Sequence, residues 1–239
     1  MQFKFISWNI WGGKNRDQVV SFLQNTPFDI LALQEVTVRD NQGNLENDAL
    51  IIAEKLRYHV TYATAFRTDR HETVYDLGNA IISKYPIEKT QVHELSDLSQ
   101  YEKNSTTEPR NAVQADIRGE DGTVIHVIST HLGYSQDLQA TPLQTYQLNK
   151  LLELVPREKT VLMGDFNSEP TSTIIQRLSE EFVVLNHLTN PSWTNFKNPS
   201  HPQHRIDYIF TTHDIHTHSF SIENSQASDH FPLFATLEV

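Results

Sequence analysis

The chain has 239 residues, of which 38% are hydrophobic and 21% are charged, and this composition predicts a folded globular protein and excludes an intrinsically disordered one. There is no cysteine, so disulfides, thiolate catalysis and cysteine-type zinc sites are excluded. The formal net charge of −11 argues against a protein that grips nucleic acid through a broad basic surface.

Short apolar, β-branched runs alternate with stretches of helical spacing along the whole chain. Leu148, Leu151 and Leu152 recur at helical spacing and predict one amphipathic helix. In chain order, we predict a strand at Phe3–Ser7, a helix at Arg16–Asn25, a strand at Ile30–Gln34, a helix at Ala49–Arg57, strands at His59–Ala65, Asn79–Ser83, Asn111–Ile117 and Val124–Thr130, a helix at Leu143–Val155, a strand at Thr160–Met163, a helix at Ser172–Glu180, and strands at Arg205–Thr211, His213–Ile222 and Phe231–Glu238.

Helices scattered among strands favour two packed sheets flanked by helices, which is an α/β (α+β) class of fold. Asp121-Gly122 lies between two strand runs and predicts a hairpin turn, so largely antiparallel pairing is expected. The polar stretches 97–109 and about 195–204 predict exposed loops. No linker or repeat interrupts the pattern, and we therefore expect a single domain over residues 1–239.

The lengths of the apolar runs indicate whether the chain could cross a membrane or be secreted. None approaches the roughly 18 residues that a membrane-crossing helix needs. The first residues lack the long apolar stretch and cleavage site of a signal peptide, and they predict a strand instead. We expect a cytoplasmic monomer that does not insert into a membrane.

Six apolar runs each carry a carboxylate, an amide or an imidazole at an end or within the run. A single polar residue after a strand ordinarily just begins a loop. Six such runs restricted to these side chains indicate a shared site instead, because burying polar groups without partners costs about 1–3 kcal/mol each. The residues are Asn9, Glu35, His131, Asp165 with Asn167, Asp207, and Asp229 with His230.

Four of these residues are carboxylates, and their proximity would be costly. Two like charges about 4 Å apart raise the energy by roughly 4 kcal/mol at an effective dielectric constant near 20. A cluster of acids therefore requires a cation, and oxygen ligands favour Mg²⁺ or Mn²⁺ over zinc. The four acids are Glu35, Asp165, Asp207 and Asp229.

The ordered set of motifs around these residues resembles the endonuclease/exonuclease/phosphatase superfamily. A further segment from Gly78 to Ile87 also resembles a recurrent part of that family. The resemblance implies a DNase I-like, four-layer α/β/β/α sandwich with the motif loops converging at one edge. The motifs, which span residues 7 to 233, are Ser7-Trp8-Asn9-Ile10, Leu33-Gln34-Glu35-Val36, Ser129-Thr130-His131-Leu132, Gly164-Asp165-Phe166-Asn167, Arg205-Ile206-Asp207-Tyr208-Ile209 and Ser228-Asp229-His230-Phe231-Pro232-Leu233.

The resemblance also implies metal and catalytic roles. Glu35 would be the principal ligand of a Mg²⁺ or Mn²⁺ ion, with Asn9 and Asp229 supporting the metal site directly or through water. Asp165 would orient or deprotonate the attacking water. Asn167 would donate a hydrogen bond to the phosphoryl oxygen as negative charge builds there.

Histidines and flanking residues complete the implied site. Asp207 would fix the tautomer of His230 and favour its charged form, which would hold the phosphate. His131 would contact the phosphate or act as an acid near the leaving group, with Glu72 or Asp76 as the carboxylate behind it. Two further residues, Arg110 as a phosphate contact and Trp11 as a ring that stacks on substrate, are candidates for substrate binding.

The implied activity is divalent-metal-dependent hydrolysis of a phosphate ester, most readily a phosphodiester, by in-line attack of water. Two alternatives remain: a nuclease acting on DNA or RNA, exonuclease III-like or deadenylase-like, and a catalytically silent member that binds phosphorylated ligands. Trp11 occupies the position at which repair endonucleases of the family often carry an acidic residue. This difference weakens an assignment to the abasic-site repair branch of the family. The negative charge allows nucleic acid as a partner without favouring it.

Overall fold

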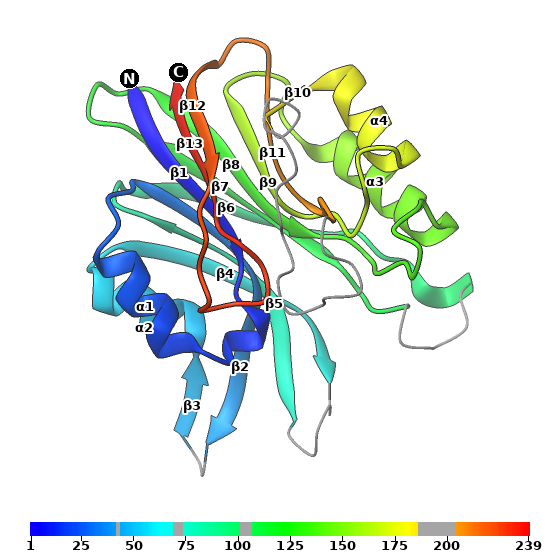
Figure 1. Cartoon of the computed structure of the whole chain (residues 1–239), viewed down its shortest axis with the longest axis horizontal. Helices are drawn as coiled ribbons and strands as arrows, with labels where there is room; N and C mark the ends of the chain where they lie inside the picture. Colours follow the sequence, from blue (N-terminus) through cyan, green and yellow to red (C-terminus); the bar gives the residue numbers. More distant parts are fainter. Residues whose placement is uncertain (42–43, 69–73, 101–106, 186–203) are drawn as a thin grey trace.

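A computed structural model describes residues 1–41, 44–68, 74–100, 107–185 and 204–239 (Figure 1). The two chain termini lie side by side, where the N-terminal ammonium of Met1 donates to the carbonyl oxygen of Val239 at 2.9 Å. The predicted loops at 97–109 and 195–204 fall partly outside the described residues.

The first sheet has seven strands, and its central strand is the first of the chain. β1 (Gln2–Asn9) pairs in parallel with β2 (Ile30–Asn41) and antiparallel with β13 (Leu233–Glu238). The order across the sheet is β12 (His216–Ile222), β13, β1, β2, β5 (Tyr75–Ser83) and β4 (His59–Thr68), with β3 (Asn44–Asn47) paired to the later half of β2.

The second sheet has six strands, and parallel pairing in its middle brings two strand ends together. β8 (Val124–His131) runs parallel to β9 (Thr160–Asp165), and the other described pairs in this sheet are antiparallel. The order across the sheet is β10 (Val183–Val184), β11 (Asp207–Thr211), β9, β8, β7 (Asn111–Arg118) and β6 (Ile87–Glu94).

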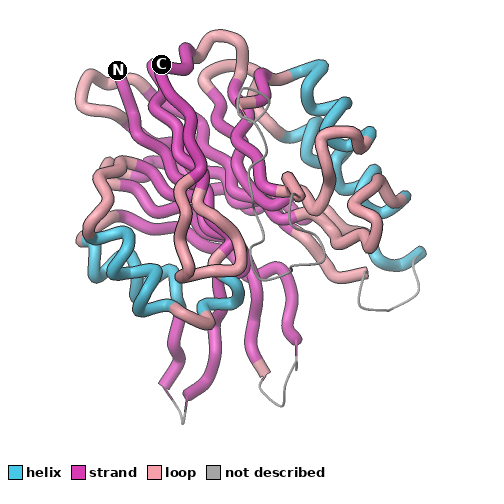
Figure 2. The backbone as a smooth tube through the Cα atoms, viewed as in Figure 1, coloured by secondary structure: helices cyan, strands magenta, loops and turns pink. Residues whose placement is uncertain are grey.

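The helices cover the outer faces of the two sheets (Figure 2). α1 (Arg16–Gln24) and α2 (Asp48–Leu56) pack on the first sheet, and α3 (Pro142–Leu154) and α4 (Thr173–Glu181) pack on the second. The start of α3 has a capping box, in which Thr141 and Gln144 satisfy each other's backbone N–H groups. No helix within the described residues is long and apolar enough to span a membrane.

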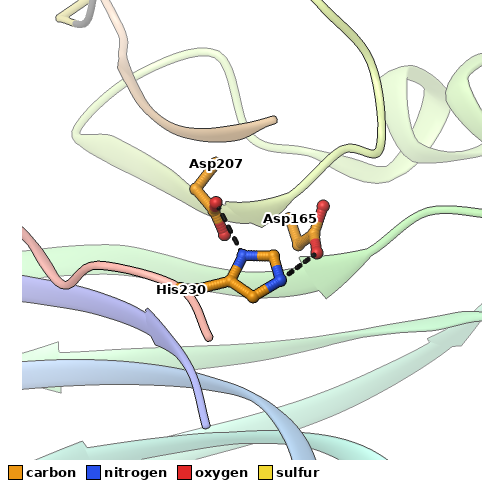
Figure 3. Close-up of side chains that lie close together, drawn as sticks. All are labelled: Asp165, Asp207 and His230. Atoms are coloured by element: carbon orange, nitrogen blue, oxygen red, sulfur yellow. Dashed lines mark hydrogen bonds and ion pairs between the residues drawn. The ribbon is translucent and has the colours of Figure 1, made fainter. Parts of the chain in front are cut away.

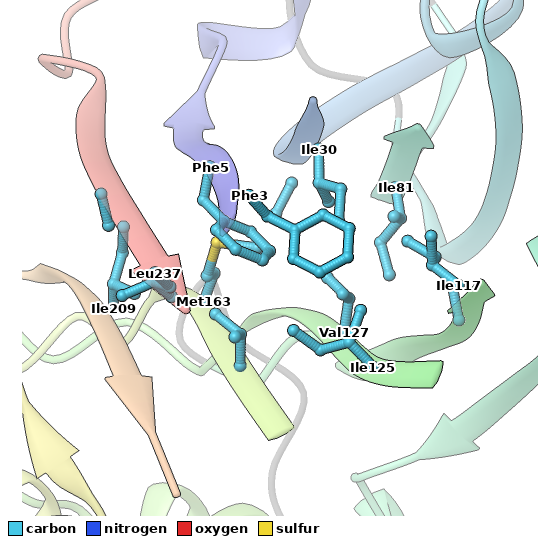
Figure 4. Packing of buried hydrophobic residues seen from close by; sticks show 14 of the residues in the cluster. Phe3, Phe5, Ile30, Ile81, Ile117, Ile125, Val127, Met163, Ile209 and Leu237 are labelled. Carbon is cyan, nitrogen blue, oxygen red and sulfur yellow. The ribbon is translucent and has the colours of Figure 1, made fainter. Parts of the chain in front are cut away.

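Three apolar cores hold these layers together. The central core fills the space between the sheets with side chains such as Phe3, Phe5, Val127 and Met163 (Figure 4). One further core lies between each sheet and its own helices. Two sheets face to face, each covered by helices, make the four-layer α/β/β/α sandwich, so the predicted DNase I-like fold class is confirmed.

Several element boundaries differ from the sequence prediction. β6 was absent from it because an edge strand that alternates exposed polar with half-buried residues gives a weak apolar signal. β3 and β10 are too short for a sequence pattern, and η1 (Trp11–Gly13) and η3 (Leu98–Gln100) are single turns. β2 continues to Asn41 instead of ending at Gln34, and β12 begins at His216 because residues 213 and 214 form a turn.

Candidate active site

Strand register in the second sheet brings three of the predicted residues together. Asp165 ends β9, with His131 of β8 on one side and Asp207 of β11 on the other. Gly164 permits this close pairing, because a Cβ atom there would lie 2.0 Å from the carbonyl oxygen of Thr130. The site therefore depends on a glycine at the position before its central acid.

The first sheet contributes Asn9, at the end of β1, and Glu35, inside β2. Glu35 lies at a β-bulge and has a φ angle of +56°, a left-handed conformation that costs a non-glycine residue about 1–3 kcal/mol. A bulge re-aims the side chain of a strand, and here the Glu35 carboxylate lies within reach of Asn9. The surrounding fold thus holds a strained residue where the family motif predicts a metal ligand.

Asn9 links the two sheets. Its side-chain amide donates to Glu35 Oε1 at 3.3 Å and to Asp165 Oδ2 at 3.1 Å, while its Oδ1 accepts from the backbone N–H of Trp11. Asn9 is fully buried, so these bonds satisfy a group that has no access to water. One amide therefore fixes the spacing between two carboxylates from different sheets.

The loop before β13 is fastened to the end of β1. Ser228 Oγ donates to the carbonyl oxygen of Asn9 at 2.6 Å and accepts from the backbone N–H of His230. The indole N–H of Trp8 donates to the carbonyl oxygen of His230 at 2.9 Å. These three bonds fix His230 and its neighbour Asp229 beside the strand end.

His230 lies between two carboxylates, as Figure 3 shows. Its Nδ1 is 2.9 Å from Asp207 Oδ2, and its Nε2 is 3.8 Å from Asp165 Oδ2. All three side chains are buried. A ring with an acid at each nitrogen is stabilised in its doubly protonated, cationic form.

His131 and Asn167 form a second polar group on the other side of Asp165. Asn167 donates through Nδ2 to His131 Nε2 at 2.9 Å and to the carbonyl oxygen of Leu132 at 3.0 Å. The backbone N–H of Asn167 donates to Asp165 Oδ1 at 2.8 Å, and His131 Nε2 lies 3.5 Å from Asp165 Oδ2. Both oxygens of Asp165 therefore have partners.

Burial and mutual repulsion raise the pKa of every acid in this group. Burial is the largest cause for each, and Asp207 then raises the pKa of Asp165 further, to about 7. Glu35, Asp207 and Asp229 shift in the same direction, although His230 opposes the shift. Burial lowers the pKa of His230, but the surrounding carboxylates outweigh it, and the pKa lies well above the ordinary imidazole value.

These shifts predict how the metal-free protein responds to pH. A folded acid with a raised pKa binds its proton more tightly than the unfolded chain does, so stability is lost as the pH rises from the ordinary pKa of 3.8 to about 7. The raised pKa of His230 acts in the same direction at higher pH. In EDTA, the melting temperature should therefore fall by several degrees between pH 5.5 and pH 8.

The variant Asp165→Asn removes the acid whose pKa is raised to about 7, so the melting temperature of this variant should fall less steeply with pH. Asp116→Asn changes an acid outside the site, whose carboxylate lies 2.6 Å from His126. The melting temperature of this control should fall with pH as it does in the wild type. Differential scanning fluorimetry from pH 5.5 to 8 measures both. Equal slopes for the wild type and Asp165→Asn would show that Asp165 does not hold a raised pKa.

The residues fit a metal ion. Asp165, Asp207 and His230 form one group among the described residues whose ligand atoms all lie within 4.8 Å of one another. Glu35 and Asp229 are both half-buried, and the Glu35 charge raises the pKa of Asp229. Four acids that repel one another in a buried site are the donor set that a hard divalent cation would stabilise.

The remaining predicted residues are placed as follows. Arg110 is buried, its guanidinium donates to Glu108 at 3.0 Å, and its positive charge lowers the pKa of Glu35. Trp11 is half-buried and adjoins the Lys14 ammonium, which lies 3.8 Å from the centre of the indole ring. Asp76 pairs with Arg67 at 2.7 Å, and Glu72 lies outside the described residues.

Two buried asparagines beside the site were not predicted from the sequence. Asn79 donates through Nδ2 to the carbonyl oxygen and the Oδ1 of Asn111, which joins β5 to β7. Both residues are buried. Asn79 belongs to the segment from Gly78 to Ile87 that resembles a part of the family, and its place in that segment was the one feature of the sequence that could have identified it. Asn111 directly follows Arg110, and no motif in the sequence indicated a role for it.

Solved structures confirm the fold. The chain aligns over its full length with 72% of an endonuclease/exonuclease/phosphatase from Beutenbergia cavernae, with a TM-score of 0.81 and 20% identity. It aligns over its full length with 99% of a protein so named from Bacteroides vulgatus, with a TM-score of 0.79 and 17% identity. For a mannosyl-6-phosphatase from Bacteroides thetaiotaomicron the TM-score is 0.73 at 17% identity, covering 99% of this chain and all of that one.

Sequence comparison gives the family. No curated protein matches the chain. A family model described as the endonuclease/exonuclease/phosphatase family matches residues 6–230, which include every motif residue except Phe231, Pro232 and Leu233. The chain therefore belongs to the endonuclease/exonuclease/phosphatase family.

Proposed function

We propose that this protein is a divalent-metal-dependent phosphoesterase that hydrolyses a phosphodiester by in-line attack of water on phosphorus. The observation that supports this proposal is the convergence on Asp165. Its two oxygens lie within 4 Å of nitrogen atoms of Asn9, His131, Asn167 and His230, which belong to four separate segments of the chain. Two of these four partners, His131 and His230, are titratable, and both are buried beside a buried carboxylate.

Glu35, Asn9 and Asp229 would hold Mg²⁺ or Mn²⁺. When bound, the ion would polarise the phosphoryl oxygen and stabilise charge on the leaving oxygen. Asp165, Asp207 and His230 also have the spacing of a metal group, but His230 has a carboxylate at each ring nitrogen. A doubly protonated imidazole has no free lone pair for a metal, which favours the partly open Glu35 and Asp229.

Asp165 is the proposed general base. Its pKa of about 7 suits proton transfer at neutral pH, because a base works best when its pKa lies near the working pH. The backbone N–H of Asn167 fixes one carboxylate oxygen at 2.8 Å, which leaves Oδ2 on the side of the two histidines. Oδ2 would accept the proton of the attacking water.

His230, held by Asp207, would contact the phosphate as a cation. Asn167 would donate to the same phosphoryl group, although both of its amide hydrogens are engaged, by His131 and by Leu132. Substrate binding must therefore replace one of these two hydrogen bonds. The bond to His131 is the one that is lost when His131 is protonated, because a protonated Nε2 can no longer accept from Asn167. His131 is accordingly the proposed acid near the leaving group.

The substrate class follows from charge and from the absence of basic tracts in the sequence. With a formal charge of −11, a small phosphodiester or a short single strand is favoured over a long duplex. One structural relative is named a mannosyl-6-phosphatase, so sugar phosphates belong among the candidates.

A panel of phosphate esters assayed with Mg²⁺ and with Mn²⁺ tests the proposal. It should contain a generic diester, bis(4-nitrophenyl) phosphate, its monoester counterpart, oligonucleotides, sphingomyelin and sugar phosphates. We expect hydrolysis of the diester with either ion and none in EDTA. Binding of phosphorylated ligands without turnover of any ester would instead favour a non-catalytic member of the family.

A further inference from the structure

Two exposed histidines stand at the start of edge strand β12, at the end of the first sheet where the chain termini meet. His216 and His218 are two residues apart, and a bulge between Thr217 and Ser219 interrupts the pairing with β13. Their ring centres lie 4.7 Å apart with the planes at 88°. Two imidazoles are thus held side by side on one strand.

A carboxylate faces the two rings from the neighbouring strand. Glu238 is the direct cross-strand partner of His216, and its Oε2 lies 2.7 Å from His218 Nε2. Gln2, the partner of Glu238 on β1, places its side-chain amide 3.0 Å from the same ring nitrogen. Three neighbouring strands therefore direct polar side chains to one point.

We propose that His216, His218 and Glu238 form a second metal site, which takes a borderline divalent cation such as Zn²⁺ and fastens edge strand β12 to β13. Two imidazoles and one carboxylate are a ligand set that zinc prefers and that Mg²⁺ does not. A water molecule or the Gln2 amide oxygen would supply the fourth ligand of a tetrahedral site.

The site forms by rotation of exposed side chains, and His216 must move furthest, because neither of its ring nitrogens lies within 4.8 Å of both other ligand atoms. Zinc lies about 2.0–2.2 Å from nitrogen and oxygen ligands, so tetrahedral ligand atoms are about 3.3 Å apart. The His218 to Glu238 separation of 2.7 Å must open by roughly half an ångström. The side chains of His218 and Glu238 are 35% and 51% exposed, and the printed neighbours of the His218 ring are the side chains of His216, Gln2 and Glu238, which can rotate with it.

This site is distinct from the catalytic residues. Gln2 and Asn9 stand at opposite ends of β1, and the intervening strand spans about 23 Å at 3.3 Å per residue. An edge strand exposes unpaired backbone groups, which makes fraying and association with other chains its characteristic weaknesses. A cation bound across β12 and β13 would oppose fraying at the end of the sheet where both chain termini lie.

Zinc titration of the whole protein tests this proposal. Isothermal titration calorimetry in excess Mg²⁺ should show one more equivalent of micromolar Zn²⁺ binding in the wild type than in His216→Ala or His218→Ala. His213→Ala is the matched control, because it removes another exposed histidine outside the cluster and should keep that equivalent. Long-range ¹H–¹⁵N spectra should show zinc-dependent shifts of the His216 and His218 ring nitrogens.

Turnover of a phosphodiester with Mg²⁺ should be unchanged in all three variants, because none belongs to the catalytic residues. Zinc should also raise the melting temperature of the control more than that of the two cluster variants. Retention of the extra equivalent in either His216→Ala or His218→Ala, or its absence from the wild type, would overturn the proposal.

Discussion

Replacing Asp165 with Asn should lower kcat for a phosphodiester by about 10³-fold to 10⁴-fold at saturating Mg²⁺, at the upper end of what a general base contributes. Asparagine has nearly the same shape and still accepts from the backbone N–H of Asn167, so the turn after β9 should persist. The amide has lost the capacity to take a proton from water. Steady-state kinetics on a generic diester measure the loss.

The matched control for this variant is Asp214→Asn. Asp214 accepts from the backbone N–H of Lys159 at 2.9 Å, so it too is a carboxylate that fixes a loop, but it lies outside the site. Activity within about twofold of the wild type is expected for it. Asp165→Asn with near-normal kcat and an unchanged melting temperature would remove Asp165 from the role of base.

The second large effect concerns the pair of Asp207 and His230. His230→Gln should lower kcat by roughly 10³-fold, because it removes the cation proposed to hold the phosphate. Asp207→Asn should lower it by roughly 10²-fold, because its carboxylate contacts His230 at 2.9 Å and acts through it. The double variant should be no slower than His230→Gln alone, since two residues that act as one unit are not additive.

A matched pair elsewhere in the same sheet provides the control. Asp116 and His126 lie 2.6 Å apart on β7 and β8, and the same two substitutions there should leave kcat unchanged. If the effects of Asp207→Asn and His230→Gln multiply in the double variant, Asp207 contacts substrate or metal on its own account. The positioning role assigned to it would then be wrong.

Much of this site could be predicted because each motif residue lies at an end of an apolar run or within one. Asp165 comes after Val161, Leu162 and Met163, and such apolar runs can be recognised in a sequence without knowledge of the fold. The ordered motifs also implied the four-layer sandwich, which strand and helix patterns alone did not fix. What the sequence could not show was the register that places His131 and Asp207 on either side of Asp165.

Three features depend on contacts between residues far apart in the sequence. The left-handed bulge at Glu35 depends on pairing with β5, which a local pattern does not contain, and β2 was predicted too short for that reason. Asn79 and Asn111 meet across sheets, although 31 residues lie between them in the chain. For His131, the described contacts with Asn167 and Asp165 join separate strands and loops, and of its two predicted carboxylate partners Asp76 pairs with Arg67 while Glu72 lies outside the described residues.

The central claim is that a divalent cation held by Glu35 joins acids that would otherwise repel one another. The most direct test is diester hydrolysis by the wild type and by Glu35→Ala across a Mg²⁺ titration, with EDTA as the zero point. We predict no turnover in EDTA, saturable activation of the wild type, and a loss of about 10²-fold or more in Glu35→Ala. Undiminished turnover in EDTA or in Glu35→Ala would contradict it.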